Sequence, residues 1–209
     1  MNIPIVRRAL EKNDLAASEN RARFDQIGLY CVNVLGGAGC GKTALLEALL
    51  PRLRGHLAAA VLEGDLATTR DAERIAALCV PVVQLLTDGG CHLTAPHVSH
   101  AVEHLPLDDI DLLFIENVGN PVCPSNFDLG EHARIAVLSV SEGDDKPSKY
   151  PLLFRRADLV VITKCDLLAH VDFQIDRAAA DIRRVSPFVE IIRASPRTGL
   201  GIDRIADWM

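Results

Sequence analysis

Residues 34–50 read VLGGAGCGKTALLEALL, a direct succession of apolar strand, glycine-rich turn and helix-forming run. Gly36, Gly41, Lys42 and Thr43 match the pattern G-x-x-x-x-G-K-[ST] in the strand-to-helix context that this phosphate-binding motif needs. Glycines let backbone N–H groups turn toward phosphate oxygens, and the helix N-terminus adds positive potential. Lys42 is expected to reach the β and γ phosphates, and the Thr43 hydroxyl to bind Mg²⁺. The alternative is a glycine-rich turn with a chance Lys-Thr pair.

The length, the net charge and the cysteine content limit which classes of protein this chain can belong to. The 209 residues, 49% of them hydrophobic, suffice for one domain with a real core. A net charge of −6 argues against a general nucleic-acid binder. Residues 1–24 lack the apolar region of a signal peptide, and no apolar run approaches the roughly 20 residues that span a bilayer. We therefore expect a cytosolic protein whose six cysteines are core residues or metal ligands.

Apolar runs alternate with helical stretches along the chain. Continuous apolar strands separated by helices are typical of a mostly parallel sheet with helices on both faces, and hence of an α/β fold. Ligands of such sheets lie beyond the carboxyl ends of the strands. We expect an N-terminal helix within residues 1–27 and a phosphate-loop domain over 28–209, together one domain. The predicted helices are 5–25, 42–54, 69–78, 95–105, 173–185 and a short one at the C-terminus, and the predicted strands are 29–35, 58–65, 81–86, 111–117, 133–140, 157–164 and 189–195.

Two acidic residues at strand ends are candidates for a magnesium site. Asp65 ends the run VLEGD and Glu116 ends LLFIE, and Mg²⁺ prefers a few hard oxygen ligands plus water. With Lys42, they are the predicted catalytic residues. Asp65 has an alternative role as a helix N-terminal cap. In ENVG, Glu116 and Gly119 occupy the place of the D-x-x-G switch of GTPases, where the Gly119 amide would sense the γ-phosphate.

The run VVITKCD (160–166) predicts the site that reads the base. It ends in Thr-Lys-x-Asp, where GTPases use Asn-Lys-x-Asp. Asp166 would accept two hydrogen bonds from guanine, which adenine cannot supply, and the stem of Lys164 would pack on the base. The alternative is a solvated Lys-Asp turn. The run ASPRTG (194–199) stands where such proteins place a backbone loop over the guanine O6, with Ser195 as the candidate contact, although Pro196 removes one N–H.

Cys91, His92 and Cys123 are the unusual features of the sequence. Thiolate and imidazole are ligands for Zn²⁺ and also suit Ni²⁺. Cys91 and His92 follow a glycine pair just before a predicted helix, and Cys123 follows Gly119 by four residues. Taken alone, a cysteine is more often a small buried hydrophobe, and three ligands are one short of a closed zinc site. The other cysteines are interpreted as core residues or, within the phosphate loop, as incidental: Cys31, Cys79 and Cys165 in the core, and Cys40 in the loop.

His97, His100 and His104 fall within an arc of about 60° on a helix of 3.6 residues per turn. They are candidates for an auxiliary metal patch. A solvated, partly charged helix face is the favoured interpretation, since such spacing by itself requires no ligand.

Taken together, the stretches GGAGCGKT, EGD, GCHL, FIENVGNPVCPSNFDLGE and SEGDDKPSKYP resemble the hydrogenase maturation GTPase family HypB. The resemblance runs from about residue 28 to the C-terminus. The pattern ENVGN-x-x-CP is far more specific than any phosphate loop. The urease nickel GTPase UreG is similar in organisation, but the segment after Gly119 favours HypB.

The resemblance implies a P-loop NTPase fold of the SIMIBI type, with a GTPase domain over 28–209. Family members dimerise with GTP and help to insert nickel into [NiFe] hydrogenase, with a HypA-like nickel chaperone and the hydrogenase large-subunit precursor as partners. The resemblance assigns the Ni²⁺ or Zn²⁺ ligands to Cys91, His92 and Cys123, shared by two subunits. It assigns the Mg²⁺ ligands to Thr43, Asp65 and Glu116. The expected nucleotide contacts are Gly36, Gly37, Ala38, Gly39, Cys40, Gly41, Lys42, Thr43, Ala44, Gly119, Lys164, Asp166 and Ser195.

Two features of some family members are missing here: a histidine-rich N-terminal tract and a nickel-binding cysteine motif near the start. Metal storage is therefore not expected. The hypothesis is a metal-binding enzyme that hydrolyses Mg·GTP to gate nickel delivery. A small-molecule P-loop kinase would need an acceptor pocket and an arginine-rich lid, of which we find no clear sign. A simple metal buffer would leave the phosphate loop unexplained, and a UreG-like urease GTPase is the nearest alternative of the same class.

Overall fold

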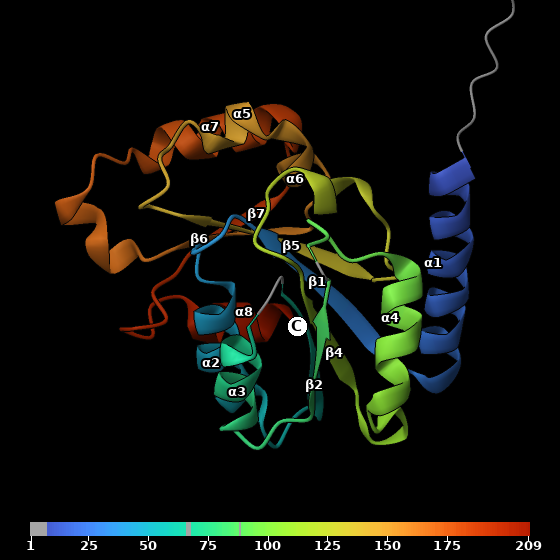
Figure 1. The fold of residues 1–209 in the computed structure, drawn as a ribbon. Coiled ribbons are helices and arrows are strands. Elements are labelled where there is room, and N and C mark those ends of the chain that lie inside the picture. Colours follow the sequence, from blue (N-terminus) through green and yellow to red (C-terminus); the bar gives the residue numbers. More distant parts are fainter. Residues whose placement is uncertain (1–7, 66–67, 88) are drawn as a thin grey trace, which may run out of the picture.

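The structure is a computed structural model that describes residues 8–65, 68–87 and 89–209. Within these residues, seven strands form one sheet in the order β3-β2-β4-β1-β5-β6-β7, and every neighbouring pair is parallel (Figure 1). The predicted α/β class is confirmed, and each predicted strand is present, with no end shifted by more than two residues. The strands are Tyr30–Gly36 (β1), Ala59–Asp65 (β2), Val82–Leu86 (β3), Leu112–Glu116 (β4), Ala133–Ser139 (β5), Leu159–Thr163 (β6) and Glu190–Arg193 (β7).

Helices cover both faces of the sheet. One face carries α2, α3 and α8, and the other carries α1, α4, α6 and α7. No helix in the described ranges is long and apolar enough to cross a membrane. The helices are Arg8–Ile27 (α1), Lys42–Leu53 (α2), Arg70–Ala76 (α3), Ala95–Ala101 (α4), Lys146–Lys149 (α5), Pro151–Arg155 (α6), Ile175–Val185 (α7) and Ile202–Trp208 (α8), with 3-10 turns at Val102–His104, Leu107–Asp109, Cys123–Asn126 and Cys165–His170.

The helix predicted over 5–25 is present as α1, and residues 5–7 of that prediction lie outside the described residues. Apart from ends shifted by up to two residues, the helical predictions differ from the structure in two places. The α-helix expected over 95–105 ends at Ala101, and a 3-10 turn continues it to His104. The short helices α5 and α6 were not predicted. Each begins at a proline-containing first turn, with Pro147 and Pro151 at positions where the missing N–H costs no hydrogen bond. Helices of four and five residues carry too little periodicity to be seen in a sequence.

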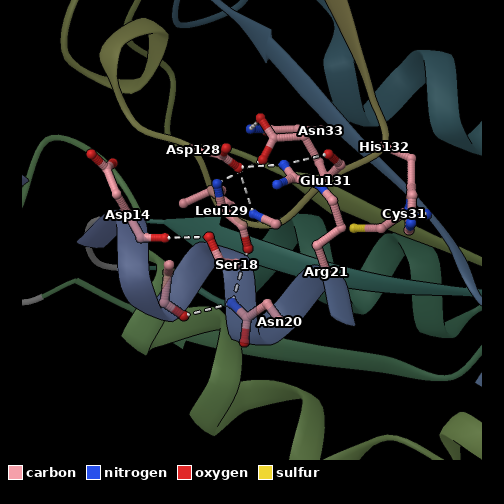
Figure 2. Close-up of polar contacts among 12 residues, drawn as sticks. Asp14, Ser18, Asn20, Arg21, Cys31, Asn33, Asp128, Leu129, Glu131 and His132 are labelled. Carbon is pink, nitrogen blue, oxygen red and sulfur yellow. Dashed lines mark hydrogen bonds and ion pairs between the residues drawn. The ribbon is translucent and has the colours of Figure 1, made fainter. Parts of the chain in front are cut away.

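Helix α1 packs on the domain through buried polar contacts as well as through Phe24 (Figure 2). The Asn20 side chain is only 3% exposed, and its Nδ2 donates to the carbonyl oxygens of Ala95 and Leu129, both at 2.9 Å. The Arg21 guanidinium pairs with Asp128 at 2.8 Å. Helix α1 also lies along α4 (Figure 1). It is therefore part of the same packed unit as the sheet.

We predict that Asn20→Ala lowers the free energy of unfolding by about 1–3 kcal/mol, because two buried carbonyl groups lose their donor. Ser18→Ala on the same helix is the control, since the Ser18 hydroxyl only donates to Asp14 of its own helix at an exposed position. Urea unfolding of both variants measures the difference. Equal losses in the two variants would contradict the docking of α1 through Asn20.

Candidate functional site

The phosphate loop joins β1 to α2, as predicted. Gly39 and Gly41 have φ values of 70° and 95°, in the left-handed region that favours glycine. A Cβ at Gly36 would lie 2.5 Å from the carbonyl oxygen of Val137, so this position also excludes larger residues. The loop, with the buried Lys42 and Thr43 at the start of α2, borders a pocket of about 440 Å³. Backbone amides at a helix N-terminus and one lysine make this pocket suitable for phosphate groups.

A group of carboxylates faces the phosphate loop across this pocket. Thr43 Oγ1 donates to Glu116 Oε1 at 2.7 Å. Glu63 stands opposite Glu116 in the register between β2 and β4. Carboxylate oxygens of Glu63, Asp71 and Glu116 all lie within 4.8 Å of one another.

Burial controls the protonation of this group. Burial raises the pKa of Glu116 to about 7, although the Lys42 ammonium opposes the shift. Burial and then the charge of Glu116 raise the pKa of Glu63 to about 8. The Oε2 atoms of Glu63 and Glu116 are buried and have no hydrogen-bond partner among the described residues. Two buried hard oxygens without partners, beside a threonine hydroxyl, fit a divalent cation such as Mg²⁺.

The sequence predicted Asp65 and Glu116 as carboxylates of the magnesium site and did not single out Glu63, which lines the same pocket. Glu63 and Asp65 both belong to β2, but the structure brings the Glu63 carboxylate next to Glu116. The Asp65 carboxylate lines the same pocket, and its Oδ2 accepts hydrogen bonds from Thr68 N at 3.1 Å and Thr68 Oγ1 at 2.7 Å. These contacts precede α3, which starts at Arg70. The signal that was available is the charge of Glu63 inside an otherwise apolar strand.

The segment that follows β4 lies directly against the phosphate loop. We call residues 116–123 the switch segment. A Cβ at Gly119 would lie 2.8 Å from Cα of Ala38, so only glycine permits this approach. Asn117 Oδ1 accepts a hydrogen bond from Val118 N at 3.0 Å and thereby shapes the turn out of the strand. The predicted pairing of Glu116 and Gly119 with the phosphate loop is therefore present in the geometry.

The Thr-Lys-x-Asp motif is tied to the same loop. Thr163 Oγ1 donates to the carbonyl oxygen of Cys40 at 2.6 Å, and Lys164 Nζ donates to that of Gly39 at 2.7 Å. Lys164 has a left-handed φ of 57°. The hydroxyl of Thr163 therefore makes a backbone contact that links the predicted base site to the phosphate site.

Asp166 lines a second, smaller pocket and is bonded from behind by the buried Ser195. Ser195 Oγ donates to Asp166 Oδ1 at 2.6 Å, so the carboxylate is held by the loop that sequence analysis placed over the base. This pocket has a volume of about 250 Å³ and is lined by Gly41, Ala44, Thr163, Lys164, Asp166, Leu167, Pro196 and Arg197. It adjoins the phosphate pocket through residues common to both, Gly41 and Lys164 among them.

The structure brings Cys91, His92 and Cys123 together, and we call them the Cys-His cluster. One ligand atom from each lies within 4.8 Å of the others. The His92 ring stacks on Phe127 with a centroid distance of 3.9 Å. Burial, with a further contribution from the charge of His97, lowers the pKa of His92, which favours the neutral ring that binds metals. These three ligands suit a borderline or soft cation and leave a coordination position open.

The other histidines and cysteines singled out in the sequence are not members of the Cys-His cluster, although His97 is close enough to influence His92. His97 Nδ1 accepts a hydrogen bond from Thr94 N at 3.2 Å and so helps to cap α4. The rings of His100 and His104 pack edge to face at 5.5 Å. Cys31, Cys40 and Cys165 are buried, as expected for those in the core. The prediction that Cys79 is a core residue is wrong, because Cys79 is exposed in a turn before β3 with φ of 57°.

A family model and several known proteins match most of the chain. The CobW/HypB/UreG nucleotide-binding domain matches residues 31–193. The hydrogenase maturation factor HypB of Azotobacter vinelandii is 50% identical over 202 residues, which are 96% of this chain and 66% of that protein. The chain thus spans slightly less than two thirds of that relative.

Two solved structures are similar over almost the whole chain. HypB from Archaeoglobus fulgidus superposes with a TM-score of 0.89 at 36% identity, covering 95% of this chain and 97% of that one. HypB from Helicobacter pylori, solved in complex with nickel, has a TM-score of 0.90 at 37% identity and covers 94% and 93% of the two chains. The chain therefore belongs to the CobW/HypB/UreG family of nucleotide-binding domains and, within it, to the hydrogenase maturation factors HypB.

Proposed function

We propose that this protein hydrolyses GTP to gate the delivery of nickel during [NiFe] hydrogenase maturation. One observation carries the proposal: the switch segment contains both Gly119, which touches the phosphate loop, and Cys123, which belongs to the Cys-His cluster. An extended chain spans at most about 3.6 Å per residue, so Cys123 is tethered within about 15 Å of Gly119. A rearrangement of this segment with the nucleotide must act on the cluster.

The phosphate end of the site supplies positioning and charge. Mg²⁺, held there by Thr43, Glu116 and Glu63, would neutralise charge on the phosphates. The short hydrogen bond from Thr43 to Glu116 orients the threonine hydroxyl, and Lys42 places a cation at the β and γ phosphates. Asp65, on the same pocket, is the further acidic residue of the reaction site.

The base end favours guanine. Asp166 presents a carboxylate whose Oδ1 is already oriented by Ser195, and the paired donors of guanine match such an acceptor. Lys164 borders both pockets and thus connects the base to the phosphates. An aspartate in this position gives adenine no matching pair of contacts.

Nickel or zinc is the cargo of the Cys-His cluster. Three ligands leave an open coordination position, and Cys91 is exposed, so the cluster is accessible from outside. A second copy of the chain, joined in a GTP-bound homodimer, would complete a shared site. A HypA-like nickel chaperone and a hydrogenase large-subunit precursor are the proposed donor and acceptor, and the cytoplasm the proposed location.

Two other functions fit less of the structure. A small-molecule kinase would require an acceptor pocket next to the phosphates, whereas the pocket that adjoins them is the one that holds Asp166. A metal buffer would need the Cys-His cluster alone and leaves the contact between Gly119 and the phosphate loop without a purpose. Urease maturation of the UreG type shares the chemistry and differs only in the target protein.

Asp166→Asn is expected to weaken guanine nucleotide binding at least about tenfold and to relax discrimination toward xanthine, since charge-assisted hydrogen bonds contribute about 1.5–3 kcal/mol each. Titration of the variant with GDP, XDP and ADP measures this. Asp181→Asn is the control, because Asp181 pairs with Arg184 on α7. Wild-type protein that binds ADP as tightly as GDP would refute the base assignment.

Lys42→Ala is expected to nearly abolish GTP turnover without unfolding the protein, because Lys42 borders the phosphate pocket rather than an apolar cluster. Phosphate release measures turnover, and circular dichroism monitors the fold. Lys149→Ala, at an exposed lysine of α5 paired with Asp145, should leave turnover unchanged. A folded Lys42→Ala variant with wild-type turnover would remove Lys42 from the mechanism.

Nickel affinity is expected to differ at least about fivefold between the GDP state and the state with a non-hydrolysable GTP analogue, the lower end of typical allosteric coupling. Cys123→Ala should abolish this difference while sparing nucleotide binding. Titration against a competing chelator measures both affinities.

Cys79→Ala is the matched control, because Cys79 is also an accessible thiol but lies before β3, whereas the residues of the cluster follow the carboxyl ends of β3 and β4. Equal nickel affinity of the wild-type protein in the two nucleotide states would defeat the gating mechanism, even with the Cys-His cluster intact.

A further inference from the structure

Three buried polar side chains form a hydrogen-bonded row that starts in the switch segment, at Asn117. Asn33, Asn117 and Glu131 are 0%, 1% and 5% exposed. On β1, the neighbouring side chains on the same face belong to two different apolar clusters, that of Cys31 and that of Leu35, so Asn33 lies between them. Buried polar groups destabilise a protein unless each one is hydrogen-bonded, so a row of this kind calls for an account of every contact.

Asn117 joins three parts of the site. Its Oδ1 accepts hydrogen bonds from Leu93 N at 3.3 Å and from Val118 N at 3.0 Å. Leu93 directly follows the ligand pair Cys91 and His92, and Val118 belongs to the switch segment. The Nδ2 of Asn117 donates to Asn33 Oδ1 at 3.3 Å. One carboxamide therefore holds the first part of the Cys-His cluster to the strand that carries Glu116.

Asn33 continues the row to the loop before β5. Its Nδ2 donates to Glu131 Oε1 at 3.3 Å, and Figure 2 shows the two side chains pointing toward one another. Glu131 Oε1 also pairs with Arg134 Nε at 2.5 Å, and Glu131 Oε2 accepts from Leu129 N at 2.6 Å. The carboxylate is thus held from two sides.

Arg134 connects Glu131 to the chain that follows Cys123, the other part of the Cys-His cluster. Its two terminal nitrogens donate to the carbonyl oxygens of Ser125 at 3.4 Å and Phe127 at 3.0 Å. These carbonyls belong to the stretch that starts at Cys123, and the ring of Phe127 stacks on His92. Both parts of the Cys-His cluster are therefore attached to the row, one through Asn117 and the other through Arg134.

The direction of each amide in the row is fixed by its surroundings. Two backbone N–H groups face Asn117 and leave its Oδ1 as the only possible acceptor there. The Nδ2 of Asn117 must then meet the oxygen of Asn33, and the Nδ2 of Asn33 must meet the acceptor-only carboxylate of Glu131. No amide in the row can rotate by 180° without losing bonds at both of its ends. A polar row that is fully satisfied in a low-dielectric interior is rigid.

We propose that the Asn117–Asn33–Glu131 row positions the Cys-His cluster relative to the nucleotide and carries the coupling between them. Asn117 couples Cys91 and His92 to the switch segment. Glu131 and Arg134 instead hold the stretch after Cys123 to the sheet. A shift of Val118 when the γ-phosphate is lost then moves the two parts of the cluster against each other. The inference rests on the proposed GTP-dependent metal delivery, and Asn33 and Glu131 act in it as positioning residues.

The test is Asn33→Ala in the full chain, because Asn33 contacts neither nucleotide pocket nor cluster. Nickel is titrated against a chelator in the GDP and GTP-analogue states, and the ratio of the two affinities is the readout. We expect the wild-type ratio of about fivefold or more to fall below about twofold, with GDP affinity unchanged. Asn33→Ser, whose side chain is too short to reach both neighbours, replaces the alanine variant if that variant does not fold.

Asn20→Ala is the matched control. Asn20 is comparably buried and also bonds distant groups, namely the carbonyl oxygens of Ala95 and Leu129 and the Ser99 hydroxyl, but it belongs to α1 and is not a member of the row. It should lower stability and retain the wild-type ratio. A folded Asn33 variant with the wild-type ratio overturns the inference, and so does an equal loss in Asn20→Ala, which would indicate general loosening. A wild-type ratio near one overturns the proposed gating itself and the inference with it, so the two failures are distinguishable.

Discussion

Gly119 lies so close to Ala38 that any side chain at position 119 would meet the backbone of the phosphate loop at 2.8 Å. This contact fixes the path of the chain as it leaves β4. Because β1 and β4 are adjacent and parallel, their carboxyl ends meet at one edge, and the loops that follow them must share that space. The position of Glu116 against Thr43 and the tether to Cys123 both follow from this arrangement.

The same edge brings two kinds of ligand chemistry together. Carboxylates buried beside the phosphate loop suit a hard cation, and thiols with an imidazole suit a softer one, so each group selects against the other's metal. The raised pKa values of Glu63 and Glu116 show that burial disfavours their charged forms in the free protein. A cation with its nucleotide would reverse that penalty, which makes phosphate binding and carboxylate ionisation mutually dependent.

Much of this structure could be predicted from sequence because the relevant signals are local. The phosphate loop is a contiguous motif, and largely apolar runs of six to eight residues identified each strand of the sheet. The pairing of Cys91 and His92 with Cys123 came from the resemblance to HypB, since 32 positions separate Cys91 from Cys123 and no spacing rule joins them. The exposure of Cys79 was missed because its apolar neighbours do not reveal a left-handed turn.

Contacts between distant residues account for the rest. Asn33 and Glu131 are 98 positions apart, and neither stands out until the sheet brings β1 beside the start of β5. Glu63 was not predicted because metal-binding carboxylates were expected at the ends of strands, whereas Glu63 lies inside β2. Thr163 looked like a weakened base motif, and its hydroxyl instead bonds the phosphate loop, a contact across 123 positions. Sequence patterns identify elements, whereas the partners of buried polar groups follow from the topology.

Amide hydrogen exchange across the change from GDP to a GTP analogue tests the central claim most directly. The claim is that phosphate loop, switch segment and Cys-His cluster respond as one unit. The account predicts that protection changes together in peptides covering residues 36–44, 91–95 and 117–127, while the distant helix α7 is unaffected. Changes confined to the phosphate loop, with residues 91–95 and 117–127 exchanging at the same rate in both states, would contradict it.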